Sequence, residues 1–201
     1  VANRVVNATN TDNDEALLNI TKTTLTTNES GTSDTFGVSL SSQPKNTVTV
    51  SITGLNALEG SLDKTSLEFT RANWSAAQVV TVTGKDDVVA DGNKTYTLTA
   101  TASSADTDYH GVTGSPISVT NIDNDTPGIT VSTATLQTTE GASNTFSISL
   151  SSQPVKDVTI NISSFDLTEG TLSVPSVTFT STDWAAKTVT VNGVVDDVDD
   201  G

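Results

Sequence analysis

An internal repeat constrains this chain more than any other feature of its sequence. The first copy reads ESGTSDTFGVSLSSQP from Glu29, and the second reads EGASNTFSISLSSQP from Glu140. The match continues downstream through Trp74 and Trp184, which lie 110 residues apart. Similarity sustained over so long a span indicates that each copy is one structural unit of a tandem array.

The repeat divides the chain into three segments. Residues 1–14 correspond to the last strand of a preceding copy followed by an acidic joint, and residues 15–125 form a complete copy. Residues 126–201 form a second copy that is truncated before its last two strands. We therefore interpret the chain as a piece of a longer protein, with the sequence Asp-Asn-Asp closing both the first and second segments, at residues 12–14 and 123–125.

Alternating apolar and polar residues predict short strands throughout the complete copy. The runs are separated by turn residues such as Gly54, Gly60 and Gly111. The predicted strands are residues 17–27, 35–40, 47–53, 66–69, 78–83, 95–101 and 117–120. About seven short strands in roughly a hundred residues are typical of an immunoglobulin-like antiparallel β-sandwich, so we expect an all-β chain of tandem sandwiches.

Composition and charge exclude several classes of function. A formal net charge of −15 repels nucleic acid and anionic membrane surfaces, and cations are the natural partners of such a chain. The absence of cysteine excludes disulfides and thiolate metal sites. No apolar run approaches the roughly 18 residues of a membrane span, so we expect no span in this fragment.

Acidic residues gather in the loops that a sandwich brings to one end. In the complete copy they follow an early strand at Glu29, the strand 78–83 at Asp86-Asp87, and the last strand at Asp123 and Asp125. Two such carboxylates repel by about 4 kcal/mol when close, at an effective dielectric constant near 20. Calcium, which takes six to eight oxygen ligands in flexible geometry, would relieve this repulsion better than magnesium or zinc.

An early Glu, an Asp-Asp pair with a following acidic turn, and a terminal Asp-x-Asp together resemble the Calx-beta module. That family is the calcium-binding β-sandwich of sodium/calcium exchangers and also occurs in tandem in bacterial surface proteins. The resemblance covers one complete copy and most of another. It implies calcium ligands at Glu29, Asp86, Asp87, Asp91, Asp123 and Asp125 in the first copy, and at Glu140, Asp196, Asp197 and Asp200 in the second.

The resemblance leaves some residues without a matching role. It leads us to expect a further acidic ligand within residues 54–62, where none is evident. We interpret Glu59 and Glu169, each followed by glycine, as exposed turn residues. Asp199 is a possible substitute for Asp200 because the second turn is shorter.

Other interpretations of the same residues stay open. Asp-Asn-Asp after a strand is also an ordinary turn in which side chains bond the backbone. Trp74 and Trp184 are either packing anchors or platforms for a sugar ring. Paired carboxylates also occur in glycosidases, but catalytic pairs occur once per enzyme whereas these recur with the repeat, so we predict no enzyme and no catalytic residues.

The sequence therefore predicts a calcium-binding tandem module of a large extracellular or cell-surface protein, and the family resemblance implies that this protein is bacterial. We expect calcium at the joints to rigidify an adhesin or matrix stalk, with calcium ions and neighbouring repeats as partners. The alternatives are a module that binds cell-surface glycans or protein receptors, and a homo-oligomeric filament formed by strand exchange. In the last case, one subunit would lend residues 1–9 to the truncated copy of another.

Overall fold

The computed structural model describes residues 4–164 and 166–197. These residues form two compact units, the first containing β1 to β9 and the second β10 to β15. All regular structure in the described residues is β-strand, and none of it is a helix of the length and apolarity that a bilayer span requires. The all-β, immunoglobulin-like sandwich fold is therefore confirmed.

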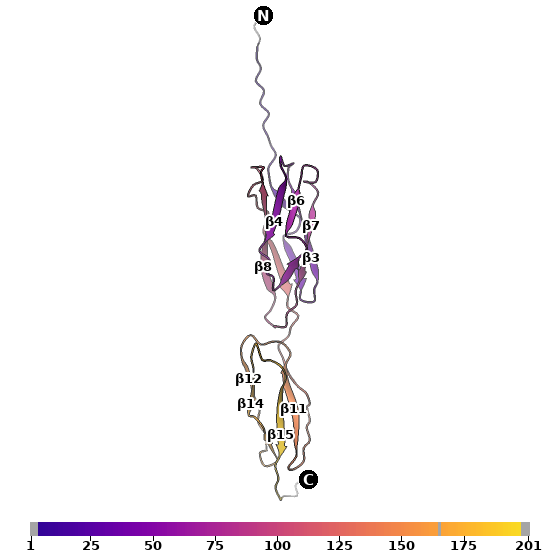
Figure 1. The fold of residues 1–201 in the computed structure, drawn as a ribbon, viewed down its shortest axis with the longest axis vertical. Helices are drawn as coiled ribbons and strands as arrows, with labels where there is room; N and C mark the ends of the chain where they lie inside the picture. Colours follow the sequence, from indigo (N-terminus) through magenta and orange to yellow (C-terminus); the bar gives the residue numbers. More distant parts are fainter. Residues whose placement is uncertain (1–3, 165, 198–201) are drawn as a thin grey trace. The chain divides into compact units, whose positions relative to one another are not determined.

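The first unit consists of two sheets (Figure 1). One sheet has the strand order β1-β3-β7-β5 and the other the order β2-β9-β8-β4-β6. The nine strands among the described residues of this unit are β1 (Leu18–Ile20), β2 (Thr24–Asn28), β3 (Ser33–Leu40), β4 (Val48–Thr53), β5 (Gly60–Leu62), β6 (Ser66–Phe69), β7 (Gln78–Gly84), β8 (Lys94–Ser104) and β9 (Ile117–Ile122).

The alternating sequence places one face of each strand in the core. In β4, Val48, Val50 and Ile52 are buried while the threonines and serine between them are not. The same period of two buries Leu98, Ala100 and Ala102 in β8, because successive side chains of a strand point to opposite faces. The inward residues of both sheets form one hydrophobic cluster.

The predicted first strand, residues 17–27, is in fact two strands in different sheets. β1 pairs antiparallel with β3, whereas β2 pairs parallel with β9. The chain changes sheets at residues 21–23, where the Thr21 hydroxyl accepts a hydrogen bond from the backbone N–H of Gly37 at 2.7 Å. The β2/β9 pair is parallel in an otherwise antiparallel unit, and it makes the two strands end side by side.

The second unit repeats this design with fewer strands. Its sheets have the orders β10-β11-β15-β13 and β12-β14. The strands are β10 (Ile129–Val131), β11 (Ser143–Leu150), β12 (Val158–Asn161), β13 (Gly170–Leu172), β14 (Ser176–Phe179) and β15 (Lys187–Gly193). Residues 135–139, the counterpart of β2, form no strand.

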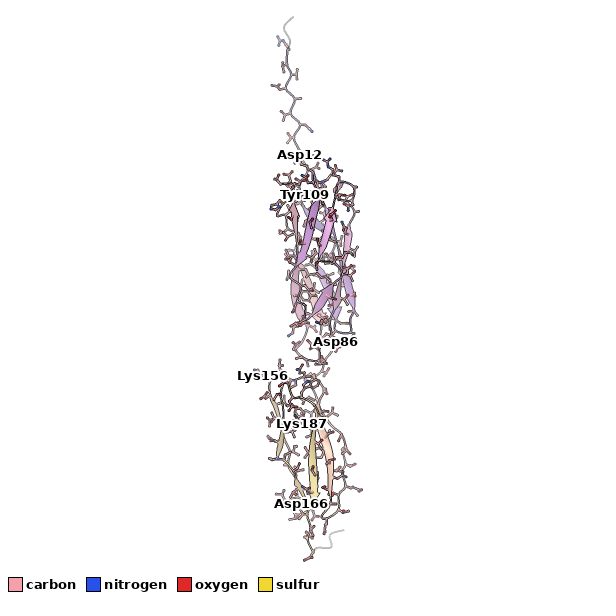
Figure 2. The ribbon with its side chains drawn as sticks, viewed as in Figure 1. Asp12, Asp86, Tyr109, Lys156, Asp166 and Lys187 are labelled. Carbon is pink, nitrogen blue, oxygen red and sulfur yellow. The ribbon has the colours of Figure 1, made fainter. Side chains whose placement is uncertain are left out.

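Residues 4–17 precede β1 and contain no strand among the part of the chain that is described. Val5 and Val6 in this segment are 84% and 87% exposed. Asp12 and Tyr109 lie at the end of the first unit where this segment joins it, whereas Asp86 lies at the opposite end (Figure 2).

Candidate metal site

The candidate site begins with Glu29, the first residue after β2. Because β2 runs parallel to β9 with Asn28 opposite Ile122, the chain leaves both strands at the same edge. The backbone N–H of Glu29 donates a hydrogen bond to the carbonyl of Ile122 at 3.1 Å. Glu29 is only 3% exposed, so its carboxylate is held at the end of β9 with little access to bulk water.

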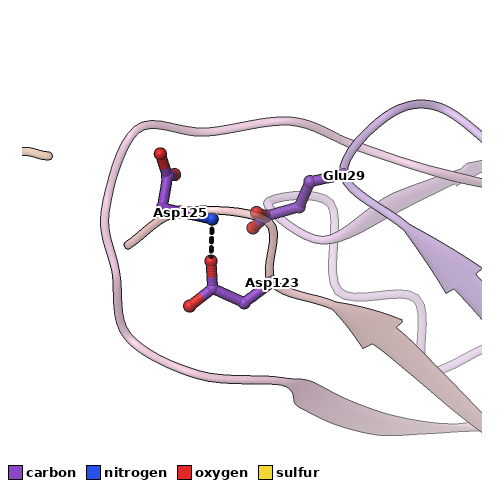
Figure 3. Close-up of side chains that lie close together, drawn as sticks. All are labelled: Glu29, Asp123 and Asp125. Atoms are coloured by element: carbon purple, nitrogen blue, oxygen red, sulfur yellow. Dashed lines mark hydrogen bonds between the residues drawn. The ribbon is translucent and has the colours of Figure 1, made fainter. Parts of the chain in front are cut away.

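Asp123 and Asp125 follow β9 directly and are held by a tight turn. The backbone N–H of Asp125 donates to Asp123 Oδ1 at 2.7 Å (Figure 3). The other oxygen, Asp123 Oδ2, accepts a hydrogen bond from the backbone N–H of Gly92 at 2.6 Å. The ordinary Asx-turn interpretation of Asp-Asn-Asp is therefore correct, and the turn also fixes the direction of the Asp123 carboxylate.

These three residues form an acidic triad. One carboxylate oxygen from each of Glu29, Asp123 and Asp125 lies within 4.8 Å of the other two (Figure 3). At such separations the negative charges repel strongly, and a cation among them replaces repulsion by attraction. Three hard oxygens supplied by two adjacent strand ends are a ligand set that could hold a metal ion.

The other predicted ligands of the first copy lie outside this triad. Asp86, Asp87 and Asp91 belong to residues 85–93, which connect β7 to β8 without a strand. Asp87 Oδ1 accepts the backbone N–H of Val89 at 2.7 Å and so stabilises a turn in that loop. Among the described residues, none of the three joins a group of closely placed acids, and their roles as ligands stay predictions.

The predicted ligands of the second copy are not gathered either. Glu140, Asp196 and Asp197 are exposed, and no group of three acids forms around them within the described residues. Glu140 lies in an isolated parallel bridge with Gly193. Asp200 and its possible substitute Asp199 lie outside the described residues.

Sequence reasoning missed Glu59, and its interpretation as an exposed turn residue is wrong. Glu59 is 6% exposed. Its Oε2 accepts a hydrogen bond from Asn121 Nδ2 at 3.3 Å. The same amide donates to the carbonyl of Lys85, while Asn121 Oδ1 accepts the hydroxyl of Thr27 at 3.0 Å. This network fixes the end of β9 immediately before the triad.

The glycine after Glu59 leaves room for the buried hydroxyl of a tyrosine. A Cβ at Gly60 would lie 2.5 Å from the Tyr96 hydroxyl. That hydroxyl is buried and has no hydrogen-bond partner among the described residues. Burial raises the pKa of the Tyr96 phenol, and the negative charge of Glu59 raises it further. The repeated Glu-Gly pair was the available signal, but Glu169 is exposed, so the pattern alone could not identify burial.

The two tryptophans act as packing residues. Trp74 packs against the core of the first unit and Trp184 against that of the second. The backbone carbonyl of Trp74 also accepts the N–H of Leu40 at 2.9 Å. This packing confirms their interpretation as anchors.

Comparison with known proteins yields fold-level similarity alone. No family model and no curated protein matches the sequence. Solved structures similar to it include CBD12 from CALX1.2, with 13% identity, 89% of this chain and 76% of that chain covered, and a TM-score of 0.39. The ASH/PapD-like domain of human CEP192 has 7% identity, 63% and 97% coverage and a TM-score of 0.45. The YadV chaperone has 8% identity, 90% and 88% coverage and a TM-score of 0.40. Similarities at this level indicate nothing about ligands, partners or activity.

Proposed function

We propose that this chain is a calcium-binding tandem β-sandwich module of a large extracellular or cell-surface protein, of bacterial origin. Calcium binds where one repeat leads into the next and rigidifies the array, which serves as an adhesin or matrix stalk or scaffold. The module performs no catalysis. The observation that carries this proposal is the triad of Glu29, Asp123 and Asp125 at the ends of β2 and β9.

The chemistry of the triad favours calcium over other ions. Its donors are carboxylate oxygens, which suit hard cations, and it contains neither histidine nor cysteine as zinc sites usually do. Calcium accepts six to eight oxygens in flexible geometry, so backbone carbonyls and water can complete a shell begun by three carboxylates. Magnesium demands a stricter octahedron and gives up its water reluctantly.

The proposed mechanism is electrostatic. Without an ion, repulsion from Glu29 drives Asp123 and Asp125 away from the end of β2 and loosens the segment that leads to β10. With calcium, the same three groups become ligands of one ion, and the segment is tied to the first sandwich. Calcium binding therefore stiffens the segment between β9 and β10, which the repulsion between carboxylates would otherwise loosen.

The resemblance to Calx-beta modules adds the remaining proposed ligands. It assigns Asp86, Asp87 and Asp91 to the first copy and Glu140, Asp196, Asp197 and Asp200 to the second. The buried carboxylate of Glu59 lies in residues 54–62, where the resemblance leads us to expect one further acidic group. Glu59 therefore supports the assignment by adding negative charge near the end of β9.

Calorimetric unfolding of the chain with and without calcium tests this function. If the dissociation constant is about 0.1 to 1 mM, as in extracellular modules, about 5 mM calcium stabilises the site by roughly 1 to 2 kcal/mol. For a domain of about one hundred residues, this corresponds to a rise in melting temperature of roughly 4–16 °C. Replacing Glu29 by Gln, or Asp123 and Asp125 by Asn, should abolish the rise.

Matched controls separate binding from general charge effects. Glu68→Gln and Asp157→Asn change exposed acids outside the triad and should keep the full response to calcium. Magnesium at the same concentration should give a much smaller shift. Two outcomes would show that the triad binds no calcium. In the first, calcium leaves the melting temperature of the native chain unchanged. In the second, calcium raises the melting temperature of the triad variants as much as that of the native chain.

A further inference from the structure

Glycine follows an aspartate or an asparagine at two places in the part of the chain that the structure describes, Asp91-Gly92 and Asn192-Gly193. In both, the glycine nitrogen can attack Cγ of the preceding side chain and close a five-membered succinimide ring, because glycine has no side chain to obstruct the approach. In an unfolded chain the asparagine reacts faster, since its neutral amide is a better electrophile than a carboxylate. The two places therefore differ in intrinsic reactivity, and the fold acts on that difference.

Strand pairing opposes the reaction at Asn192. This residue lies in β15, opposite Ser143 of β11 and opposite Thr171 of β13. The backbone N–H of Gly193 donates a hydrogen bond to the carbonyl of Ala142 at 2.9 Å. Ring closure requires a rotation about the Cα–C bond of Asn192 that takes the residue out of the extended conformation and breaks both pairings. The folded second unit therefore protects the more reactive of the two sequences.

The backbone around Asp91 lacks this protection. Asp91 and Gly92 are both exposed and lie in residues 85–93, which connect β7 to β8 without a strand. A Cβ added at Gly92 would have no atom of the described residues within 4 Å, whereas one added at Gly193 would lie 2.3 Å from the carbonyl oxygen of Thr139. No strand pairing among the described residues has to open before a ring closes at Asp91.

The group that accepts the glycine N–H also differs between the two places. The nitrogen must lose its proton as it bonds to Cγ, so a base beside it assists the reaction. The N–H of Gly92 donates to Asp123 Oδ2 at 2.6 Å, and a carboxylate at this distance can take the proton. The carbonyl of Ala142, which accepts the N–H of Gly193, is a far weaker base. Asp123 is therefore placed to promote ring closure at Asp91.

We propose that Asp91 is a site of spontaneous isomerisation and that the fold reverses the order of reactivity between Asp91 and Asn192. The nitrogen of Gly92 bonds to Cγ of Asp91 and the Cγ–O bond breaks. The displaced oxygen leaves as water with the amide proton and a second proton from the carboxyl group or the solvent. Water then adds to the main-chain carbonyl carbon of Asp91, and the bond from that carbon to the Gly92 nitrogen breaks. The product is isoaspartate, and water is the only co-reactant.

The modification would alter the loop that accompanies the acidic triad. Isoaspartate adds one methylene group to the backbone between residues 91 and 92, which displaces the N–H that now fixes Asp123 Oδ2. It also moves the carboxylate of Asp91 onto the former main-chain carbon. If the proposed function holds, on which this step rests, the modified chain binds calcium more weakly. Bound calcium in turn slows the reaction, because an Asp123 carboxylate that ligates the ion is a poorer base.

Peptide mapping of the full chain tests the site, after several weeks at physiological temperature and neutral pH in a chelator. Enzymatic methylation of isoaspartate locates and quantifies the product. In the folded chain, we expect isoaspartate at residue 91 to form at least about tenfold faster than at residue 192. In urea, residue 192 should lead. Asp91→Glu keeps the charge but would have to close a six-membered ring, so it should remove the signal at residue 91. Equal or faster formation at residue 192 in the folded chain overturns the proposal.

Two further measurements test the role of Asp123. Asp123→Asn keeps a hydrogen-bond acceptor but removes the base, and it should slow isomerisation of Asp91 several-fold in a chelator. An unchanged rate overturns Asp123 as the proton acceptor. Calcium should slow the reaction of the native chain several-fold and leave that of Asp123→Asn nearly unchanged. If calcium slows neither chain, protection by the ion is overturned, whereas the calorimetric response of the native chain to calcium still decides the proposed function.

Discussion

The first and second units share a repeated sequence but differ in how completely it is buried. Phe36 in β3 is 1% exposed, while its counterpart Phe146 in β11 is only partly buried. Among the described residues, the buried cluster of the first unit has eighteen members, whereas that of the second has four, Ile148, Val177, Phe179 and Val189. The difference shows that β8 and β9 complete the core, because the strands shared by both units leave it open.

The largest effects are expected where both units bury the same aromatic residue. Phe69 and Phe179 are counterparts, and each is 0% exposed. Phe69→Ala should lower the free energy of unfolding of the first unit by about 3 to 5 kcal/mol, because its neighbours are close-packed and cannot fill the cavity. Phe179→Ala should cost less, nearer to 3 kcal/mol, because half-buried neighbours can relax. Calorimetry that resolves two transitions measures both.

Leu58→Ala serves as the control for these core variants, since Leu58 is 71% exposed and should change neither transition appreciably. Equal losses for Phe69→Ala and Phe179→Ala would show that the second core is packed as tightly as the first.

A smaller effect is expected where β8 crowds one unit alone. Gly54 has a φ of 89°, and a Cβ there would lie 2.2 Å from the carbonyl oxygen of Thr97 in β8. Its counterpart is Ser164, and positive φ is confined to glycine among the described residues. Gly54→Ser should therefore destabilise the first unit by about 1 to 3 kcal/mol, whereas Ser164→Gly should change the second by less than about 1 kcal/mol. Urea denaturation compares the two, and a neutral Gly54→Ser would contradict the crowding.

The smallest effect concerns an ion pair present in the first unit. Asp34 bonds Lys22 Nζ at 2.6 Å, and its counterpart in the second unit is Asn144. Burial opposes ionisation, but the Lys22 ammonium and the N–H groups of Thr26 and Thr35 together lower the pKa of Asp34 below 3.8. The resulting stability is present above the ordinary pKa and is lost as pH falls through the lower pKa of the folded state.

Asp34→Asn should consequently cost up to about 1 kcal/mol at neutral pH, as expected for a largely surface pair, and less near pH 2, because the contribution of the carboxylate is lost as pH falls through its lowered pKa. Denaturation at both pH values checks this. The substitution gives the first unit the residue that the second unit has at this position. If the loss of unfolding free energy were as large at pH 2 as at neutral pH, its cause would be packing and not charge.

Much of this fold could be predicted from alternation alone. The strand at residues 66–69 has the predicted bounds, and those at 47–53 and 78–83 differ by one residue. The division of residues 17–27 between two sheets could not be predicted from the sequence, because β1 and β2 continue one alternating pattern. They differ only in the strands with which they pair, β3 for β1 and β9 for β2. β5 was also missed, since three residues around a glycine are indistinguishable from a turn.

The site was predicted in part for a similar reason. Glu29, Asp123 and Asp125 could be identified because each comes shortly after a predicted strand, and the two strands end side by side in the fold. Loop residues such as Asp86, Asp87 and Asp91 follow a strand as well, but loop conformation decides where their carboxylates lie. The burial of Glu59 depends on Asn121, which is sixty-two residues away, and a short motif contains no information about such a pairing.

The parallel pairing of β2 with β9 has a mechanical consequence. Tension that enters the first unit at its leading strands and leaves after β9 pulls these two neighbours in opposite directions along their length. All five residue pairs then carry load together, in shear, instead of opening one after another from an end. Glu29 and Asp123 lie just beyond the two strands. An ion bound by them would hold the ends of β2 and β9 together at the point where force leaves the unit.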